Sequence, residues 1–197
     1  MTSVILATRN EGKVREMQLL LANAGWTLKS PADSNLASPP EDGLTFFENA
    51  LIKARHASKV SGMAALADDS GLVVHALGGR PGIFSARFAG SDATDQQNNT
   101  HLLEAMRAED NRQAWFVCSL VFLLRHDHPE PLIATGRWGG EILREPRGKN
   151  GFGYDPLFLV PKLGKTAAEL DPIVKNNLSH RGLACRDLLR QINHPGD

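Results

Sequence analysis

The pattern of apolar and polar residues predicts a strand, a turn and a helix at the start of the chain. Residues 3–7 (SVILA) are a brief apolar run of the kind that forms a buried strand. Apolar residues then recur at helical spacing over 14–24, and Gly25 is a suitable C-terminal stop. Residues 26–29 indicate a second strand. The polar stretch TRNEGK (8–13) therefore joins a strand to a helix.

The next segments predict a loop, a helix and another buried strand. Residues 30–43 are rich in Pro, Ser and Asp, which is typical of a loop. Thr45 and Glu48 are spaced as a capping box, and they open a helix that we expect to end near Gly62. The apolar run 63–67 (MAALA) is a strand candidate that ends at the polar sequence DDSG.

The remaining chain continues to mix helical and strand-like patterns. A hairpin is expected because two apolar, β-rich runs flank the turn HDHPEP. The predicted elements are a helix over 95–107, strands over 114–125, 132–138 and 157–160, and a final helix that begins near Ser179. Such mixing indicates an α/β class. No linker is visible, so we expect a single domain with two lobes over residues 1–197.

Composition limits the partners. Lys plus Arg and Asp plus Glu both number 22, so the formal net charge is zero, which argues against a nucleic acid polymer as the ligand. No apolar run approaches the roughly 20 residues that span a bilayer, so no membrane partner is expected. Cys118 and Cys185 lack metal-ligand spacing and are interpreted as buried or incidental thiols. The N-terminus lacks the basic stretch of a signal peptide, and the expected location is cytoplasmic.

The turn TRNEGK is the first candidate for ligand binding. It is not a P-loop, because Ala7 stands where the first glycine would be and Val14 replaces the Ser or Thr that holds magnesium. A strand-to-helix turn nevertheless directs backbone N–H groups and the positive helix end towards an anion such as phosphate. Thr8, Asn10 and Lys13 add donors. The alternative is that Asn10 only caps the helix and Lys13 is solvated.

Carboxylates and a lysine form the second group of candidates. Asp68 and Asp69 follow an apolar strand, and only one of them can face a given site if the extended geometry persists. Together with Glu41, one of them could hold Mg²⁺ with substrate phosphates. Lys53 could reach a phosphate or orient an acid. The alternatives are a turn at DDSG, a solvated loop acid at Glu41 and a surface lysine.

Two later segments carry further candidates. In NGFGYDP (150–156), the glycines allow close backbone approach, an aromatic ring could stack on a base, and Asp155 could accept hydrogen bonds. Lys175 and the sequence Ser179-His180-Arg181 offer donors to an anion or a carbonyl oxygen. The alternatives are a tight structural turn at the first segment, and a helix cap at Ser179 followed by solvated basic residues at the second.

Taken in order along the chain, these segments resemble the inosine/xanthosine triphosphate pyrophosphatase family. The resemblance covers nearly the whole chain, and its specificity lies in the ordered set rather than in any single motif. The matching stretches are LATRNEGKVREM, EDGLTFFENALIKARHA, ADDSGLVV, GGRPGIFSARFAG, NGFGYDPLF, GKTAAEL and LSHRG.

The resemblance implies hydrolysis of ITP, dITP and XTP to the monophosphate and pyrophosphate, with Mg²⁺ as cofactor. It implies an α/β fold of ITPase-like, Maf/Ham type, in which a mixed sheet with flanking helices forms two lobes around a central cleft. A homodimer is also implied. The expected partner is thus a small nucleotide.

The site residues implied by the resemblance fall into three groups. Asp69 and Lys53 are the catalytic candidates, with Asp69 as proton acceptor. Glu41 and Asp69 are the metal candidates. The substrate-binding candidates are Thr8, Arg9, Asn10, Glu11, Gly12, Lys13, Ser70, Phe152, Gly153, Tyr154, Asp155, Lys175, His180 and Arg181. One departure concerns Val174, which stands where an acid is frequent and leaves the pairing of Lys175 open.

Base selection has a physical rationale within this hypothesis. Hypoxanthine and xanthine present an oxygen at C6, whereas adenine presents an N–H₂ donor. His180, Arg181 and backbone N–H groups are donors and would favour the oxygen. Two other functions compete with this one: a Maf-like nucleotide pyrophosphatase, and a nucleotide sensor without catalysis. The segments SHR and FGYDP disfavour the first, and the pair Glu41 and Asp69 disfavours the second.

Overall fold

The computed structural model describes residues 2–30 and 37–194, so part of the predicted loop over 30–43 lies outside the described residues. The chain forms two compact units. Unit 1 comprises Met1–Asp69, Cys118–Gly136 and His180–Asp197, and unit 2 comprises Ser70–Val117 and Arg137–Ser179. The expectation of a single two-lobed domain around a cleft stays a prediction.

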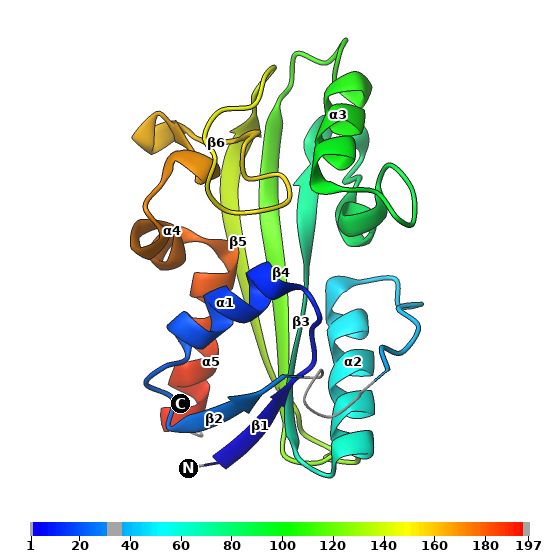
Figure 1. Cartoon of the computed structure of the whole chain (residues 1–197), viewed down its shortest axis with the longest axis vertical. Coiled ribbons are helices and arrows are strands. Elements are labelled where there is room, and N and C mark those ends of the chain that lie inside the picture. The colour runs from blue at the N-terminus through cyan, green and yellow to red at the C-terminus, as the bar shows by residue number, and fades with distance from the viewer. Residues whose placement is uncertain (1, 31–36, 195–197) are drawn as a thin grey trace. The chain divides into compact units, whose positions relative to one another are not determined.

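Helices and strands alternate along the chain, as an α/β class requires (Figure 1). The α-helices are α1 (Glu11–Leu20), α2 (Phe46–Ser61), α3 (Asp95–Ala105), α4 (Pro172–Leu178) and α5 (His180–Asn193). The strands are β1 (Thr2–Leu6), β2 (Trp26–Lys29), β3 (Ala64–Val74), β4 (Gln113–Leu123), β5 (Leu132–Ile142), β6 (Phe158–Val160) and β7 (Lys165–Thr166). Short 3₁₀ turns occupy His75–Leu77, Gly82–Arg87, Pro161–Leu163 and Ala167–Glu169.

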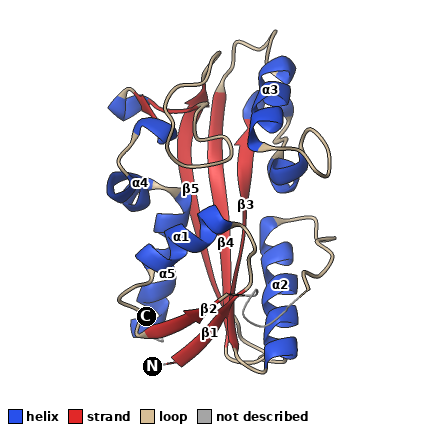
Figure 2. Cartoon of the chain, viewed as in Figure 1, coloured by secondary structure: helices blue, strands red, loops and turns tan. Residues whose placement is uncertain are grey.

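The strands form one mixed sheet in the order β2-β1-β3-β4-β5-β6-β7 (Figure 2). β1 pairs in parallel with β2 and with β3, whereas β6 is antiparallel to both β5 and β7. β4 and β5 are neighbours in the sheet, as the predicted hairpin requires. The expected α/β class with a mixed sheet and flanking helices is therefore confirmed.

The two faces of the sheet in unit 1 have separate cores. Because side chains alternate along a strand, Leu6 and Leu66 pack with α1 and α5, whereas Ile5, Ala65 and Ala67 pack with α2. Figure 1 shows α1 and α5 on one side of these strands and α2 on the other. The register Ile5↔Ala65 and Leu6↔Leu66 places matching faces of β1 and β3 side by side.

Helix α2 confirms the predicted bounds. The Thr45 side chain accepts a hydrogen bond from the Glu48 N–H, and Gly62 takes a left-handed conformation at the C-cap. Ala50, Ala54 and Ala57 are each 0 % exposed on the face that meets the sheet. Small side chains at this spacing let the helix lie close to the strands, which brings its polar residues near Asp69 in the middle of β3.

Unit 2 is built around an aromatic core. Phe116 of β4, Trp138 of β5 and Phe158 of β6 are in mutual ring contact, with centroids 4.5 to 6.4 Å apart. Gly140 is required here, since a Cβ at that position would collide with the Leu159 carbonyl oxygen and the Phe158 ring. Tyr154 is part of the same buried cluster.

Several boundaries differ from the sequence predictions. The strand expected to end at residue 67 continues to Val74, so the alternative of a turn at DDSG is wrong. The first helix begins at Glu11, inside TRNEGK, and ends at Leu20. Gly25 lies beyond it at φ +69°, in the turn before β2. Helix α4 and strand β7 were not predicted, because both are too short for a periodic pattern.

Two further findings concern the cysteines and the helices. Cys118 and Cys185 are both free and buried, and burial raises the pKa of the Cys185 thiol to about 12. Across the described residues, each helix is either too short or too polar to cross a membrane.

Candidate active site

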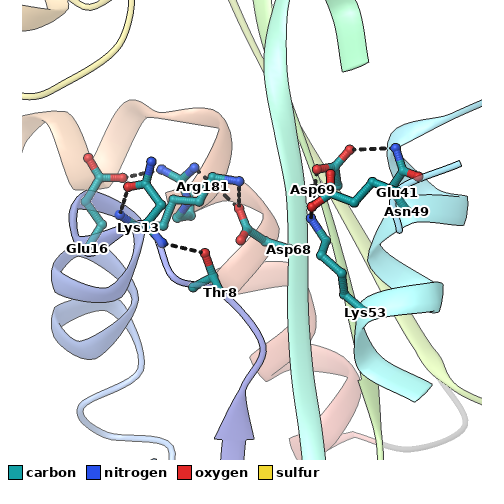
Figure 3. A network of polar contacts seen from close by, with 10 residues as sticks. Thr8, Lys13, Glu16, Glu41, Asn49, Lys53, Asp68, Asp69 and Arg181 are labelled. Carbon is teal, nitrogen blue, oxygen red and sulfur yellow. Dashed lines mark hydrogen bonds and ion pairs between the residues drawn. The ribbon is translucent and has the colours of Figure 1, made fainter. Parts of the chain in front are cut away.

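The neighbouring aspartates of β3 point to opposite faces of the sheet in unit 1 (Figure 3). Asp68 continues the side of Leu66, and Asp69 continues the side of Ala67. Their exposed fractions are 0 % and 6 %. A buried carboxylate is costly unless it is paired. Each aspartate accordingly meets its own set of polar side chains.

The Asp68 cluster consists of Lys13, Glu16, Asp68 and Arg181. Lys13 Nζ lies 3.0 Å from Asp68 Oδ2, and Arg181 Nη2 lies 3.5 Å from the same oxygen. Arg181 also forms an ion pair with Glu16. The two positive and two negative charges within the cluster cancel.

The electrostatics of this cluster favour its ionised form. Burial opposes the charge of Asp68, but Lys13 and Arg181 together hold the pKa of this carboxyl well below its usual range. Burial likewise opposes the charge of Arg181, whereas Asp68 and Glu16 raise its pKa. Pairing within the cluster therefore keeps Asp68 and Arg181 ionised despite their burial.

Local structure explains how the Asp68 cluster forms. Lys13 and Glu16 are three residues apart on α1 and thus share a helix face. Arg181 is the second residue of α5, whose first residue lies against β5. Gly136 makes that approach possible, since a Cβ there would collide with the His180 carbonyl oxygen.

The Asp69 cluster consists of Glu41, Asn49, Lys53 and Asp69. Lys53 Nζ donates to Asp69 Oδ1 at 2.8 Å and lies 3.4 Å from Glu41 Oε1. Asn49 Nδ2 donates to Asp69 Oδ2 at 3.4 Å, and its own Oδ1 accepts from the Gly43 N–H. Asn49 and Lys53 stand one turn apart on α2. The helix therefore presents two donors to one carboxylate.

The charges of the Asp69 cluster do not cancel. Lys53 carries one positive charge against the two carboxylates of Glu41 and Asp69. Burial raises the pKa of Asp69, although Lys53 opposes that shift. Burial opposes the charge of Lys53, but Asp69 and its neighbouring acids raise the pKa of this amine. The interpretation of Lys53 as a surface lysine is wrong, since it is 8 % exposed.

The donor set is suited to a cation that also binds phosphate. Mg²⁺ is typically held by one or two carboxylates together with waters and substrate phosphates. Glu41 and Asp69 converge on the same lysine and carry the excess negative charge that such an ion would balance. Within residues 2–30 and 37–194, no group of three or more His, Cys, Asp or Glu side chains forms a complete metal site.

The turn TRNEGK has a partly structural role. Asn10 Oδ1 accepts from the Lys13 N–H at 3.0 Å and caps α1, and Thr8 Oγ1 accepts from the Asn10 N–H. The interpretation of Asn10 as a cap is thus correct for its side-chain oxygen. The alternative of a solvated Lys13 is wrong, because its side chain is only 14 % exposed and contacts Asp68.

The remaining residues of TRNEGK differ in exposure. Arg9 and Glu11 are exposed, and Glu11 pairs with Arg15 one turn along α1. Gly12 is buried in the first turn of the helix. Binding of phosphate by this turn stays a prediction.

In unit 2, the segment 150–156, which we name the aromatic turn, is held by an internal ion pair. Lys175 Nζ lies 2.5 Å from Asp155 Oδ2, and the same carboxylate accepts from the Phe152 N–H at 2.9 Å. Lys175 Nζ is also 5.1 Å from the centroid of the Phe152 ring. The pairing of Lys175, left open because Val174 is not an acid, is therefore made with Asp155.

The two aromatic rings of the turn have different surroundings. Tyr154 is 4 % exposed and its hydroxyl donates to the Ser85 carbonyl oxygen at 2.8 Å, whereas Phe152 is half-buried. Gly151 is required by its φ of +76° and by the Asp155 carboxylate, with which a Cβ would collide. Of the two rings, Phe152 is the one with surface available for a base.

Ser70, His180 and Arg181 complete the predicted set. Ser70 is half-buried in β3, directly after Asp69. His180 and Arg181 are 5 % and 1 % exposed, so the alternative of solvated basic residues is wrong. Arg181 donates to Glu16 and Asp68. A contact between either residue and a purine base stays a prediction.

Sequence reasoning missed some members of these clusters. Glu16 was not singled out, although its position three residues after Lys13 on one helix face was a usable signal. Asp68 was noted beside Asp69 but received no role of its own. Its partner Arg181 is 113 residues away in sequence, and no local pattern joins the two.

Comparison with known proteins identifies the family. The model of the Ham1 family matches residues 4–191. This chain belongs to the Ham1 family. The resemblance predicted from the sequence is thereby confirmed.

Individual relatives of this Ham1-family chain match it at full length. A dITP/XTP pyrophosphatase from Shigella flexneri and one from Escherichia coli (strain K12) are each 54 % identical over 196 residues, which is 98 % of this chain and 100 % of each relative. The solved structure of a HAM1 protein from Coxiella burnetii has a TM-score of 0.91 at 48 % identity. That comparison covers 98 % of this chain and 99 % of the other.

Proposed function

We propose that this Ham1-family protein is a nucleoside triphosphate pyrophosphatase that removes non-standard purine nucleotides. It hydrolyses ITP, dITP and XTP to the monophosphate and pyrophosphate. The full-length relatives named dITP/XTP pyrophosphatase support the reaction class. The observation that carries the catalytic assignment is the buried Asp69, held between Lys53 and Asn49 with Glu41 on the same lysine.

The chemistry of the proposal is assigned to the Asp69 cluster of unit 1. Water attacks the α-phosphorus, the bond to the β-phosphate oxygen breaks, and pyrophosphate leaves. Asp69 accepts the proton of the attacking water, or would be one of the residues that hold the metal ion beside that water. Burial raises the pKa of Asp69, which favours the first role, whereas a cation bound beside this carboxylate would oppose that shift. Lys53 fixes the direction of the carboxylate by its 2.8 Å contact.

Mg²⁺ is part of the proposal as the cofactor. Glu41 and Asp69 would hold it together with phosphate oxygens, and they leave room for the ligands that the substrate supplies. Bound there, the ion would neutralise charge that develops on the leaving pyrophosphate. Lys53 would then be displaced from one of its two carboxylates, while Asn49 keeps its contact with Asp69.

Base recognition is assigned to the aromatic turn of unit 2. Phe152 is half-buried and would stack on the purine, and the Asp155–Lys175 pair fixes its backbone and supplies a cation beside its ring. His180 and Arg181 are retained as proposed donors to the C6 oxygen. Arg181 already binds Asp68 and Glu16, so contact with a base requires it to share or exchange those partners.

A homodimer, which the family resemblance implies, and a cytoplasmic location, which was expected from the sequence, also belong to the proposal. Light scattering on the purified protein tests the dimer, since a mass near twice 21.4 kDa is expected. A mass near that of one chain would contradict it.

The deciding experiment is phosphorus NMR of dITP incubated with the protein, with and without Mg²⁺, beside dATP as a control. We expect pyrophosphate and dIMP, formed only with Mg²⁺ and much faster than the products of dATP. Inorganic phosphate together with dIDP would contradict cleavage at the α-phosphorus. Bound but intact dITP would favour the nucleotide sensor. The Maf-like alternative is disfavoured by the Ham1-family match.

A further inference from the structure

Within unit 2, two side chains of helix α3 bind the backbone N–H and C=O at the centre of the aromatic turn. Asp95 Oδ2 accepts a hydrogen bond from the Gly153 N–H at 2.6 Å. Asn99 Nδ2 donates to the Gly153 carbonyl oxygen at 2.9 Å. Both polar groups of one glycine are therefore bound by side chains that lie 54 and 58 residues away in sequence.

Helix geometry explains why these two side chains act together. Asp95 is the first residue of α3 and Asn99 lies four residues further, so both project from the same helix face. The orientation of the Asn99 amide is fixed, since a carbonyl oxygen can only accept and the Nδ2 group must face it. Asp95 offers an acceptor and Asn99 a donor, which matches the N–H and C=O of one residue.

Helix α3 is itself anchored and can serve as a support. Asn98 is 3 % exposed, its Nδ2 donates to the Ala86 carbonyl oxygen, and its Oδ1 accepts from the Ala89 N–H. A capping box between Thr94 and Gln97 fixes the first turn of the helix. The side chains at 95 and 99 thus project from a rigid element.

Gly153 needs such support because of its conformation. Its φ is +60°, and a Cβ at this position would meet no atom within 4 Å, so the backbone angle rather than crowding favours glycine here. A glycine is also the residue with most freedom to leave that angle. Its neighbours Phe152 and Tyr154 would move with it, and Phe152 is the partly exposed ring of the turn.

We propose that Asp95 and Asn99 are positioning residues that set base recognition by fixing the backbone of Gly153 and thereby the ring of Phe152. The inference rests on the proposed function, in which Phe152 stacks on the purine. Neither residue takes part in the chemistry, which belongs to the Asp69 cluster. Loss of either contact therefore weakens nucleotide binding and leaves the hydrolytic step nearly unchanged.

The test compares steady-state kinetics with dITP for Asp95→Ala, Asn99→Ala, Asp95→Asn and Asn99→Asp. Loss of one hydrogen bond corresponds to a rise in KM of about 5-fold, and kcat should stay within about 2-fold of the original. Asp95→Asn keeps an oxygen acceptor, so its KM should lie close to that of the original protein rather than to that of Asp95→Ala. Asn99→Asp places a carboxylate, which can only accept, against the Gly153 carbonyl oxygen. Its rise in KM should therefore exceed that of Asn99→Ala.

The matched control is Gln96→Ala, which changes an exposed side chain on the same turn of α3. Equal KM values for Asp95→Ala, Asn99→Ala and Gln96→Ala would overturn the inference. A fall in kcat that parallels a fall in thermal midpoint, without a change in KM, would also overturn it, because that is the signature of a merely structural role.

A second readout does not depend on activity. Amide hydrogen exchange of Gly153, followed by NMR with ¹⁵N-labelled glycine, should accelerate in Asp95→Ala and stay slow in Gln96→Ala. Unchanged exchange in Asp95→Ala would contradict the geometry. If the original protein does not hydrolyse dITP, the proposed function fails, while the exchange experiment still decides whether α3 fixes the turn.

Discussion

The Asp68 and Asp69 clusters begin from adjacent identical residues on one strand, yet they differ in charge balance. Asp68 meets two cations, and Glu16 balances the second of them, so its cluster is neutral. Asp69 meets one cation that it shares with Glu41, and its cluster keeps an excess negative charge. The pKa of Asp68 is lowered and that of Asp69 is raised.

The difference supports separate roles for the two carboxylates, with Asp69 as the reactive one in the proposed function. A buried charge that is paired with opposite charges stays ionised in the fold, and removal of one member of such a pair destabilises the protein. A carboxylate whose charge burial disfavours, in a cluster with one cation for two acids, is instead suited to accept a proton or a metal ion. The strand provides both because consecutive side chains face opposite helices, and the helices carry different complements of charge.

The largest effect is expected for Asp69→Asn, which should lower kcat with dITP by about 10³-fold because a catalytic carboxylate is lost. The amide keeps the size of the side chain and can still accept from Lys53. Since the folded state disfavours ionised Asp69, the urea midpoint should not fall. Pyrophosphate release and urea unfolding measure the two quantities, and normal turnover in the folded variant would rule out the assignment.

The matched change Asp68→Asn should act on stability. It removes the carboxylate that Lys13 and Arg181 share and leaves Glu16 as the acid that pairs with Arg181, and breaking a buried pair in this way costs about 3 kcal/mol of unfolding free energy. Urea unfolding at neutral pH gives this value. If Asp68→Asn lost activity without losing stability, the two clusters would not differ in the way that their charges indicate.

The smallest effect concerns pH. The lowered pKa of Asp68 gives stability above the unfolded value of about 3.9, and this contribution disappears as the pH falls towards the folded pKa. The stability gap between the original protein and Asp68→Asn should therefore shrink below about pH 4. Urea unfolding at a series of pH values measures it.

The same pH series tests Asp69, for which the pH dependence of the unfolding free energy should have the opposite sign. Its raised pKa means that stability relative to Asp69→Asn is greatest at low pH and is lost as the pH rises through the folded pKa. Parallel pH profiles for the two variants would contradict the comparison.

Much of the fold was predictable because its signals are local. The cap at Thr45, the left-handed Gly62 and the alanine-rich face of α2 all follow from side chains within a few residues of one another. The strand over Trp26–Lys29 was also predicted with correct bounds. The continuation of β3 through Asp68 and Asp69 was not, since two adjacent acids usually indicate a turn and only distant cations reverse that preference.

By itself the sequence determined the α/β class, the turn TRNEGK, the family resemblance and the residue types available for chemistry. It also predicted that Asp68 and Asp69 would face opposite sides if the strand remained extended. Tertiary structure decided which cations each aspartate receives, that Arg181 lies 1 % exposed between Asp68 and Glu16, and that α3 holds Gly153. The physical reason is that charge balance and burial depend on residues brought together across 12 to 165 positions, and no local pattern encodes those distances.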